Sequence, residues 1–221
     1  GASLILTAST AERSAIAAAR AAYIAGFSAT SNLEAGRTWG IPTMGTAAHS
    51  WTLLHDTEED AFRAQIEALG IDTTLLVDTY DIRTGVETAI RVAGTGLGGV
   101  RLDSGDLPTV AAAVREQLDA LGATGTRITV TSDLDEYAIA ALAASPVDAY
   151  GVGTSVVTGS GYPTAGMVYK LVARQDDAGG WVSVAKASAD KGSHGGRKAA
   201  FRTLRDGLAS AETVTVSDGF E

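Results

Sequence analysis

Helix-like windows and short apolar runs alternate along the chain. In five windows rich in Ala, Leu, Glu and Arg, apolar residues recur three and four positions apart, which predicts helices. These windows cover residues 10–23, 56–69, 82–92, 108–121 and 134–143. Between them lie short runs of Val, Ile, Leu and Thr bounded by Gly or Asp, which predict strands. They cover residues 42–46, 74–77, 98–102, 127–131 and 147–150.

The spacing of these elements predicts a parallel sheet. Short apolar strands separated by helices are typical of βαβ units, and no linker interrupts them. The pattern therefore favours one continuous barrel or an open sheet. From Gly151 the chain becomes rich in Gly, Ser and Thr. Residues 167–174 and 181–187 are predicted β segments around a turn at 176–180, and the segment from Ala199 is predicted to be antiparallel or irregular.

Composition narrows the class of protein. The chain has 221 residues, 45% of them hydrophobic and 19% charged, which is typical of a folded globular protein. The formal charge of −9 argues against a general attraction to nucleic acid or to an anionic membrane. Without cysteine there is neither a disulfide nor thiolate chemistry. No apolar run is long enough for a membrane-spanning helix. The chain begins with Gly1, so we expect a processed or tagged start or a part of a longer protein.

Polar residues follow each predicted strand, where ligands bind in parallel α/β proteins. Any one of these clusters could be a helix cap, because Asp and Ser are favoured there. Five in succession are harder to explain as caps. Three supply carboxylates, one of these has an arginine beside its carboxylate, and another cluster contains His49. Together they predict a site for a polyphosphate with Mg²⁺.

Two glycine-rich segments are candidate phosphate loops. Gly151, Gly153 and Thr154 follow a predicted strand, so backbone N–H groups could approach an anion there, although such turns are common. The segment 191–198 is locally basic and is either a surface loop or an anion clamp. His49 follows a strand end among small residues, and an ordinary histidine remains an equal alternative. No zinc-ligand spacing and no nucleophile elbow are present in the sequence.

The ordered motifs resemble the nicotinate phosphoribosyltransferase family. The resemblance runs over residues 15–202, and each motif is modest while the ordered set is specific. The carrying motifs are ARAAYIAGF through TSN, then GIPT with GTAAHS, VDTYD, VRLDSGD, SDLDE, GVGT and YKL. The resemblance implies an irregular α/β barrel, complete or incomplete, of the type II phosphoribosyltransferases, with a β-rich C-terminal extension. We expect the barrel portion in residues 1–158 and phosphate-binding loops and β structure of the same domain in 159–221.

The implied reaction joins nicotinate to phosphoribosyl pyrophosphate, giving nicotinate mononucleotide and pyrophosphate in NAD salvage. ATP would drive it by phosphorylating His49. The other implied residues surround ribose, phosphates and Mg²⁺, with Asp78 and Asp103 catalytic and Asp103 an indirect magnesium ligand. The remaining substrate-binding positions are Arg101, Asp133, Gly153, Thr154, Lys191 and Arg197. The family also implies a cytoplasmic homodimer with shared active sites.

Ser31 bears on the choice of pyridine substrate. It falls where nicotinamide-using relatives carry an acid, so Ser31 favours nicotinate. Two features depart from the family: its members are about twice as long, and no arginine precedes Arg13. The alternatives are therefore a nicotinamide- or quinolinate-using phosphoribosyltransferase, or a non-catalytic phosphate-binding fragment. The His49 motif argues against the quinolinate alternative.

Overall fold

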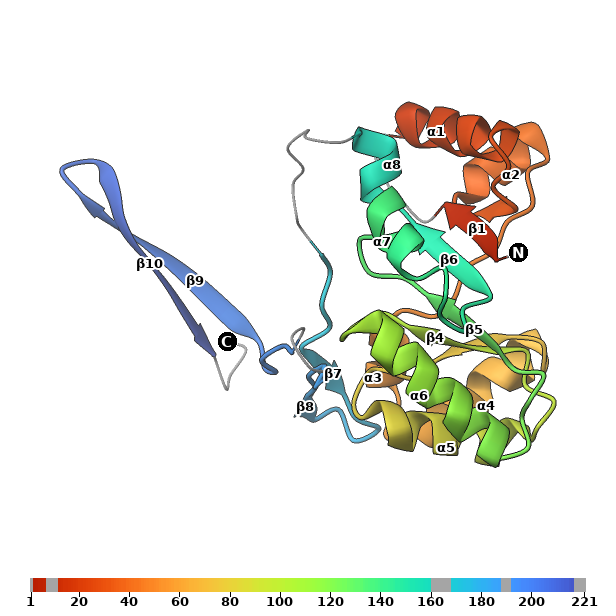
Figure 1. The fold of residues 1–221 in the computed structure, drawn as a ribbon. Coiled ribbons are helices and arrows are strands. Elements are labelled where there is room, and N and C mark those ends of the chain that lie inside the picture. The colour runs from red at the N-terminus through yellow and green to blue at the C-terminus, as the bar shows by residue number, and fades with distance from the viewer. Residues whose placement is uncertain (1, 7–11, 160–167, 188–191, 217–221) are drawn as a thin grey trace.

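A six-stranded parallel sheet curls into half of a barrel (Figure 1). The computed structural model describes residues 2–6, 12–159, 168–187 and 192–216. The strands lie in the order β2-β1-β6-β5-β4-β3, and every neighbouring pair is parallel. Their bounds are β1 Ser3–Leu6, β2 Ala29–Thr30, β3 Thr74–Leu76, β4 Gly99–Leu102, β5 Arg127–Val130 and β6 Ala149–Val152. The strands β3, β4, β5 and β6 lie side by side in the sheet in the same order as in the sequence. This is the strand order of an α/β barrel.

The five predicted helices are confirmed as α1 Glu12–Ile24, α4 Glu58–Leu69, α5 Ile82–Ala93, α6 Leu107–Ala120 and α7 Glu136–Ala141. Local signals set several starts: the Thr57, Asp81 and Asp135 side chains each accept from a backbone N–H three residues on. Three short helices were not predicted: α2 Leu33–Trp39, α3 His49–Leu54 and α8 Thr154–Thr158. These helices are only five to seven residues long, which is too short for a helical hydrophobic period to show in the sequence.

The predicted strand at 42–46 is wrong. Only Thr43 forms a bridge there, parallel to Thr30 of β2. The sequence analysis did not predict β1, which pairs with β6, or β2, which pairs with β1. The two residues of β2 are too few to show a hydrophobic pattern. They form a strand because they pair with β1. The other four predicted strands are confirmed to within two residues.

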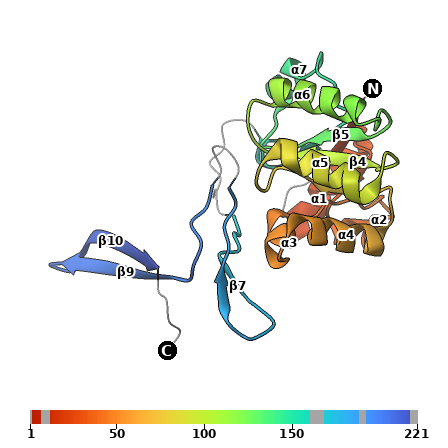
Figure 2. The same cartoon turned by 90° about the horizontal axis from the view of Figure 1, so that it is seen from below.

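The main core lies between the sheet and the helices α4 to α7 (Figures 1 and 2). Leu75, Val100 and Ile128 are completely buried there. Helix α5 approaches β3 so closely that a Cβ on Gly85 would lie 2.4 Å from the carbonyl oxygen of Val77. A glycine is therefore required at this crossing. A second, smaller cluster joins β1 to α1 and α2 through Leu6, Ala19 and Ile41.

The strands after residue 158 pair antiparallel. β7 Ala173–Gln175 and β8 Trp181–Ser183 form the predicted hairpin with shorter strands than expected, and Met167 lies outside the described residues. β9 Lys198–Arg205 and β10 Leu208–Val216 form a second hairpin, which settles the open prediction for this segment as antiparallel. This hairpin projects away from the half-barrel (Figures 1 and 2). The division at residue 158 stays a prediction.

Candidate active site

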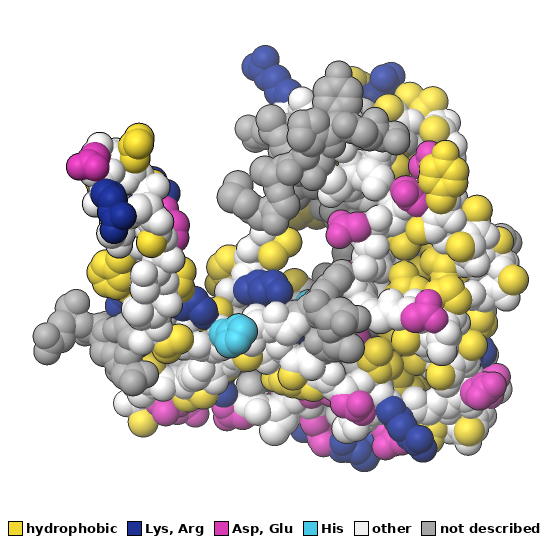
Figure 3. All heavy atoms as spheres, turned by 60° about the vertical axis from the view of Figure 1, so that its left-hand side comes forward, with side chains coloured by type: hydrophobic (Ala, Val, Ile, Leu, Met, Phe, Trp, Pro, Cys, Tyr) yellow, Lys and Arg dark blue, Asp and Glu magenta, His cyan; other side chains and the backbone are white. Residues whose placement is uncertain are grey.

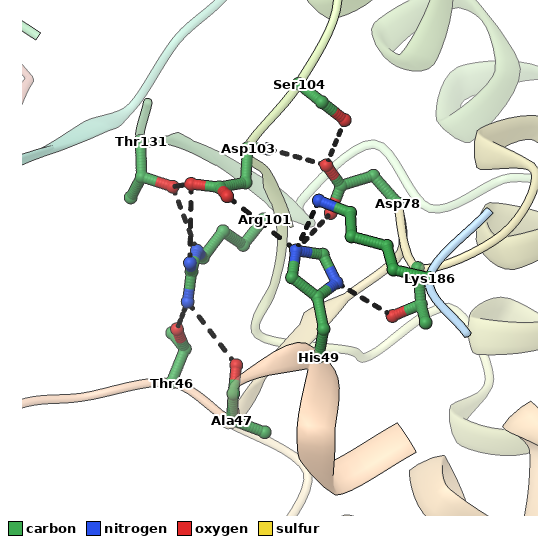
Figure 4. A network of polar contacts seen from close by, with 10 residues as sticks. Thr46, Ala47, His49, Asp78, Arg101, Asp103, Ser104, Thr131 and Lys186 are labelled. Atoms are coloured by element: carbon green, nitrogen blue, oxygen red, sulfur yellow. Dashed lines mark hydrogen bonds and ion pairs between the residues drawn. The ribbon is translucent and has the colours of Figure 1, made fainter. Parts of the chain in front are cut away.

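Three of the five predicted polar clusters meet at one edge of the sheet (Figure 4). Asp78 follows β3, Arg101 lies within β4, Asp103 comes directly after it, and Thr131 follows β5. Parallel strands end at the same edge, so side chains at these positions converge. His49 reaches the group from the first residue of α3. The structure thus brings together four of the predicted site residues: His49, Asp78, Arg101 and Asp103.

Both ring nitrogens of His49 have partners. Nδ1 lies 3.1 Å from the hydroxyl oxygen of Thr79, which is completely buried. Nε2 lies 2.7 Å from Nζ of Lys186. Two carboxylates lie farther off, with Asp103 Oδ2 at 3.7 Å and Asp78 Oδ1 at 3.9 Å from Nε2. The ring is thus fixed in orientation and faces negative charge at Nε2.

Asp78 is a buried carboxylate with one oxygen held by the fold. Its side chain is completely buried, and Oδ2 accepts hydrogen bonds from the Asp103 backbone N–H at 3.0 Å and from the Ser104 hydroxyl at 2.5 Å. Oδ1 is buried, has no hydrogen-bond partner among the described residues, and is the oxygen that faces His49. A buried acceptor without a donor is costly. This oxygen is therefore available to a ligand or to a protonated histidine.

Arg101 ties three segments together. Its Nε donates to the Thr131 hydroxyl at 3.0 Å, and its Nη1 donates to the Thr46 hydroxyl and to the Ala47 carbonyl oxygen. Nη2 lies 3.5 Å from Asp103 Oδ1, which also accepts from the Thr131 hydroxyl. The loop before His49 is thereby attached to β4 and β5. The guanidinium and the carboxylate remain partly exposed, so both can reach a ligand.

Lys186 is the site residue that the sequence analysis missed. It belongs to a predicted strand, residues 181–187, of which only residues 181–183 form β8. It is only 6% exposed, and an almost fully buried lysine requires partners. A single lysine in a run of Val, Ala and Ser was the available signal, and the pattern alone could not show what it faces.

The other predicted substrate-binding residues lie around this group or outside the description. Gly153 and Thr154 follow β6 at the start of α8, and Ser31 follows β2, so all three share the edge of the strand ends. Asp133 is exposed after β5, and both it and Ser132 have positive φ, 49° and 120°. Non-glycine residues with such φ values cluster at functional sites. Arg197 is exposed on the segment before β9, and Lys191 lies outside the described residues.

Glu58 is a half-buried acid close to Asp78. It is the first residue of α4, and its Oε1 is buried without a hydrogen-bond partner among the described residues. Burial, with the negative charges of Asp81 and Asp78, raises the pKa of Glu58 to about 7. The sequence analysis treated residues 56–59 as an acidic first turn and so missed that one of these acids faces inward.

The donor set fits a magnesium ion held largely by a substrate. In the described part of the chain, no cluster of three or more His, Cys, Asp or Glu could hold a metal by itself. Mg²⁺ usually takes one or two carboxylates and completes its shell with water and substrate phosphates. Asp103 offers a partly exposed carboxylate in this setting, beside the cationic Arg101.

The fold and the site define a class of protein. This is a parallel α/β half-barrel that gathers a histidine, two carboxylates, an arginine and a lysine at the strand ends, where parallel α/β enzymes have their active sites. Solved structures support the fold. A nicotinate phosphoribosyltransferase from Porphyromonas gingivalis matches 87% of this chain and 56% of its own, with a TM-score of 0.76 and 21% identity. A nicotinate-nucleotide pyrophosphorylase from Pyrococcus furiosus matches 100% of this chain and 55% of its own, with a TM-score of 0.67 and 21% identity.

Sequence relatives identify the family. A nicotinate phosphoribosyltransferase of Mycobacterium tuberculosis, pncB1, is 60% identical over 202 residues, which are 88% of this chain and 44% of the relative. A nicotinate phosphoribosyltransferase of Bacillus subtilis is 43% identical over 196 residues, 84% of this chain and 40% of the relative. No family model matches the sequence. The chain belongs to the nicotinate phosphoribosyltransferase family, and it spans less than half the length of these relatives. In the described residues no helix is long and apolar enough to cross a membrane.

Proposed function

We propose that this chain carries the catalytic residues of a nicotinate phosphoribosyltransferase, gathered where the parallel strands end. The reaction joins nicotinate to phosphoribosyl pyrophosphate, and ATP hydrolysis drives it through a phosphorylated His49. The observation that supports it most is the placement of His49 Nε2 beside a cation, Lys186, and two carboxylates, Asp78 and Asp103. The sequence identity to proteins that carry this name supports the same reaction.

Each group has a task in this chemistry. Breaking the bond between ribose and pyrophosphate leaves positive charge on the sugar, which Asp78 and Asp103 stabilise. The departing pyrophosphate is anionic and is met by Arg101. Asp103 would hold a magnesium ion, which would supply further positive charge for the leaving group. Gly153 and Thr154 receive the 5′-phosphate, and Lys191 and Arg197 complete the phosphate contacts. Asp133 is one of the groups around the ribose, the pyrophosphate and magnesium. A cytoplasmic homodimer with shared active sites belongs to the same proposal.

Phosphorylation of His49 tests the ATP coupling directly. The chain is incubated with radiolabelled ATP and magnesium, and acid-labile label on the protein is measured. We expect label that is lost at least tenfold in H49Q. His55→Gln is the matched control, because His55 lies on the neighbouring C-cap of α3 and bonds the Trp51 carbonyl oxygen. Label that persists in H49Q overturns the phosphohistidine. A chain that takes no label refutes the ATP-coupled mechanism for this chain.

Ser31 tests the pyridine substrate. We expect turnover of nicotinate in preference to nicotinamide, since a neutral hydroxyl does not repel a carboxylate. The substitution S31D introduces a like charge and should reduce use of nicotinate relative to nicotinamide. Preference of the unsubstituted chain for nicotinamide or quinolinate would refute the assignment and favour the corresponding relative.

A further inference from the structure

The hydrogen bond between Lys186 and His49 restricts where protons can be. The distance of 2.7 Å between Nζ and Nε2 requires one N–H donor and one lone pair. A free lysine keeps its proton to a far higher pH than a free imidazole does. Lys186 is therefore the donor, and Nε2 of His49 is the acceptor. A neutral imidazole has one accepting nitrogen, so Nδ1 carries the proton and donates to the Thr79 hydroxyl.

The carboxylates near the ring favour the opposite arrangement. Asp103 and Asp78 each place an oxygen within 4 Å of Nε2, and negative charge attracts a proton to the nearer nitrogen. Without Lys186 the proton would thus move to Nε2. We propose that Lys186 is a positioning residue that keeps His49 in the Nδ1–H tautomer and leaves the lone pair of Nε2 directed into the site (Figure 4).

The backbone holds both partners of the ring in one place. Ala187, next to Lys186, donates its N–H to the Thr79 carbonyl oxygen at 3.0 Å, while the Thr79 side chain faces Nδ1. Lys186 is also tied to the glycine-rich segment, since its N–H donates to the Ser193 hydroxyl and its carbonyl oxygen accepts from the Ser193 N–H, both at 2.9 Å. These contacts of Lys186 and Ala187 with Ser193 and Thr79 thereby position the ammonium against His49.

The tautomer decides which nitrogen can act as nucleophile. In the Nδ1–H form only Nε2 has a lone pair that can attack phosphorus, and Lys186 donates to that lone pair until a phosphoryl group arrives. This consequence rests on the proposed function. The tautomer itself does not, because it is a property of the chain without substrate.

Long-range ¹H–¹⁵N spectra of the imidazole in the whole 221-residue chain, near neutral pH and without ligands, test the proposal. H49Q identifies the His49 signals. We expect Nε2 unprotonated and Nδ1 protonated in the unsubstituted chain, a loss of this pattern in favour of Nε2–H in K186M, and its retention in K186R, whose guanidinium still donates. Lys198→Met is the matched control, since Lys198 is an exposed lysine whose Nζ donates to the His194 and Gly196 carbonyl oxygens.

Two results would overturn the proposal. One is a proton on Nε2 in the unsubstituted chain, a result that needs no variant and so does not depend on whether K186M folds. The other is an unchanged tautomer in K186M that keeps a dispersed amide spectrum. Either result leaves ATP labelling of His49 unaffected as a separate question, so failure of this proposal and failure of the proposed function are distinguishable.

Discussion

The half-barrel and the β9–β10 hairpin both consist of regular secondary structure, but only the half-barrel has a buried hydrophobic core. Residues of β3 to β5 such as Leu75, Val100 and Ile128 are completely buried. In the hairpin every residue except the half-buried Ala199 is exposed. The hairpin stands apart from the body in the space-filling view (Figure 3). Backbone pairing within a hairpin is local, whereas burial needs other layers of the molecule.

Polar contacts also differ between the two regions: those of the half-barrel are buried or partly buried, and the ion pair of the hairpin is exposed. In the half-barrel, Asp78 and Arg101 are packed against strand ends and hold their partners in fixed positions. On the hairpin, Arg202 pairs with Glu212 across the strands in the open. Exposed ion pairs contribute little to stability, while removal of a buried partner leaves an unpaired polar group. We therefore expect substitutions in the half-barrel, and not those in the hairpin, to change both the free energy of unfolding and the chemistry of the site.

Leu102→Ala should have the largest effect. Leu102 is completely buried at the end of β4, so the substitution removes apolar contacts and leaves a cavity. We expect a loss of about 3 kcal/mol in the free energy of unfolding. Urea denaturation followed by circular dichroism measures it. A loss below about 1 kcal/mol would contradict the burial of this side chain.

Arg101→Met should have the next largest effect. It removes the donors to Thr131, Thr46 and Ala47 and leaves Asp103 without the arginine beside it. We expect about 1–3 kcal/mol of destabilisation in urea denaturation. Arg83→Met is the matched control, because Arg83 is exposed and pairs with Glu87 one helical turn away. Equal effects of the two substitutions would mean that Arg101 does not join the three segments.

Glu58→Gln should change how stability depends on pH. The pKa of Glu58 is raised from 4.5 to about 7 in the folded chain, so the folded state binds this proton more tightly than the unfolded state. The stability that the protonated acid provides is present at low pH and is lost as pH rises from 4.5 through about 7. Glutamine stays neutral and should not show this loss.

Urea midpoints measured across that window check the prediction. The difference between E58Q and the unsubstituted chain should grow with pH in favour of E58Q. Glu67→Gln, an exposed position on the same helix, is the control and should follow the unsubstituted chain. Parallel pH profiles for E58Q and the unsubstituted chain would show that the pKa of Glu58 is not raised in the folded chain.

Leu204→Ala should have the smallest effect. It is the same substitution as in β4, but Leu204 is 59% exposed on β9. We expect a change of less than about 0.5 kcal/mol in the same urea assay. A loss similar to that of Leu102→Ala would show that the hairpin is covered in solution by another surface and would remove the contrast between the two regions.

Much of the fold could be predicted because the strongest patterns are local. The helices α1, α4, α5, α6 and α7 are six to fourteen residues long, and most carry a readable cap or an amphipathic stripe. The strand at 42–46 failed because an apolar run was taken for pairing that only Thr43 achieves. β2 was missed because its two residues depend on β1 for their bonds.

The candidate site divides in the same way. Asp78, Arg101 and Asp103 were predicted because polar residues at the ends of parallel strands converge wherever the strands pair. His49 was predicted after a strand at 42–46 that does not form, and it reaches the site from the first residue of α3 instead. Lys186 could not be predicted, since it comes from a segment 137 residues away from His49 and reaches the site through tertiary contacts. Glu58 was interpreted as an acid of the first turn of a helix, and only the packing of α4 shows that its Oε1 is buried.

The sequence by itself determined the α/β class, the helices with strong periodicity, and the acids and the arginine at the ends of the strands. Local propensity and the fixed direction of parallel strands are sufficient for these. Only the tertiary structure decided which lysine meets His49, which acid is buried, and which hairpin packs against nothing in the described chain. Those outcomes depend on distances between segments far apart in sequence, and local patterns carry no information about such distances.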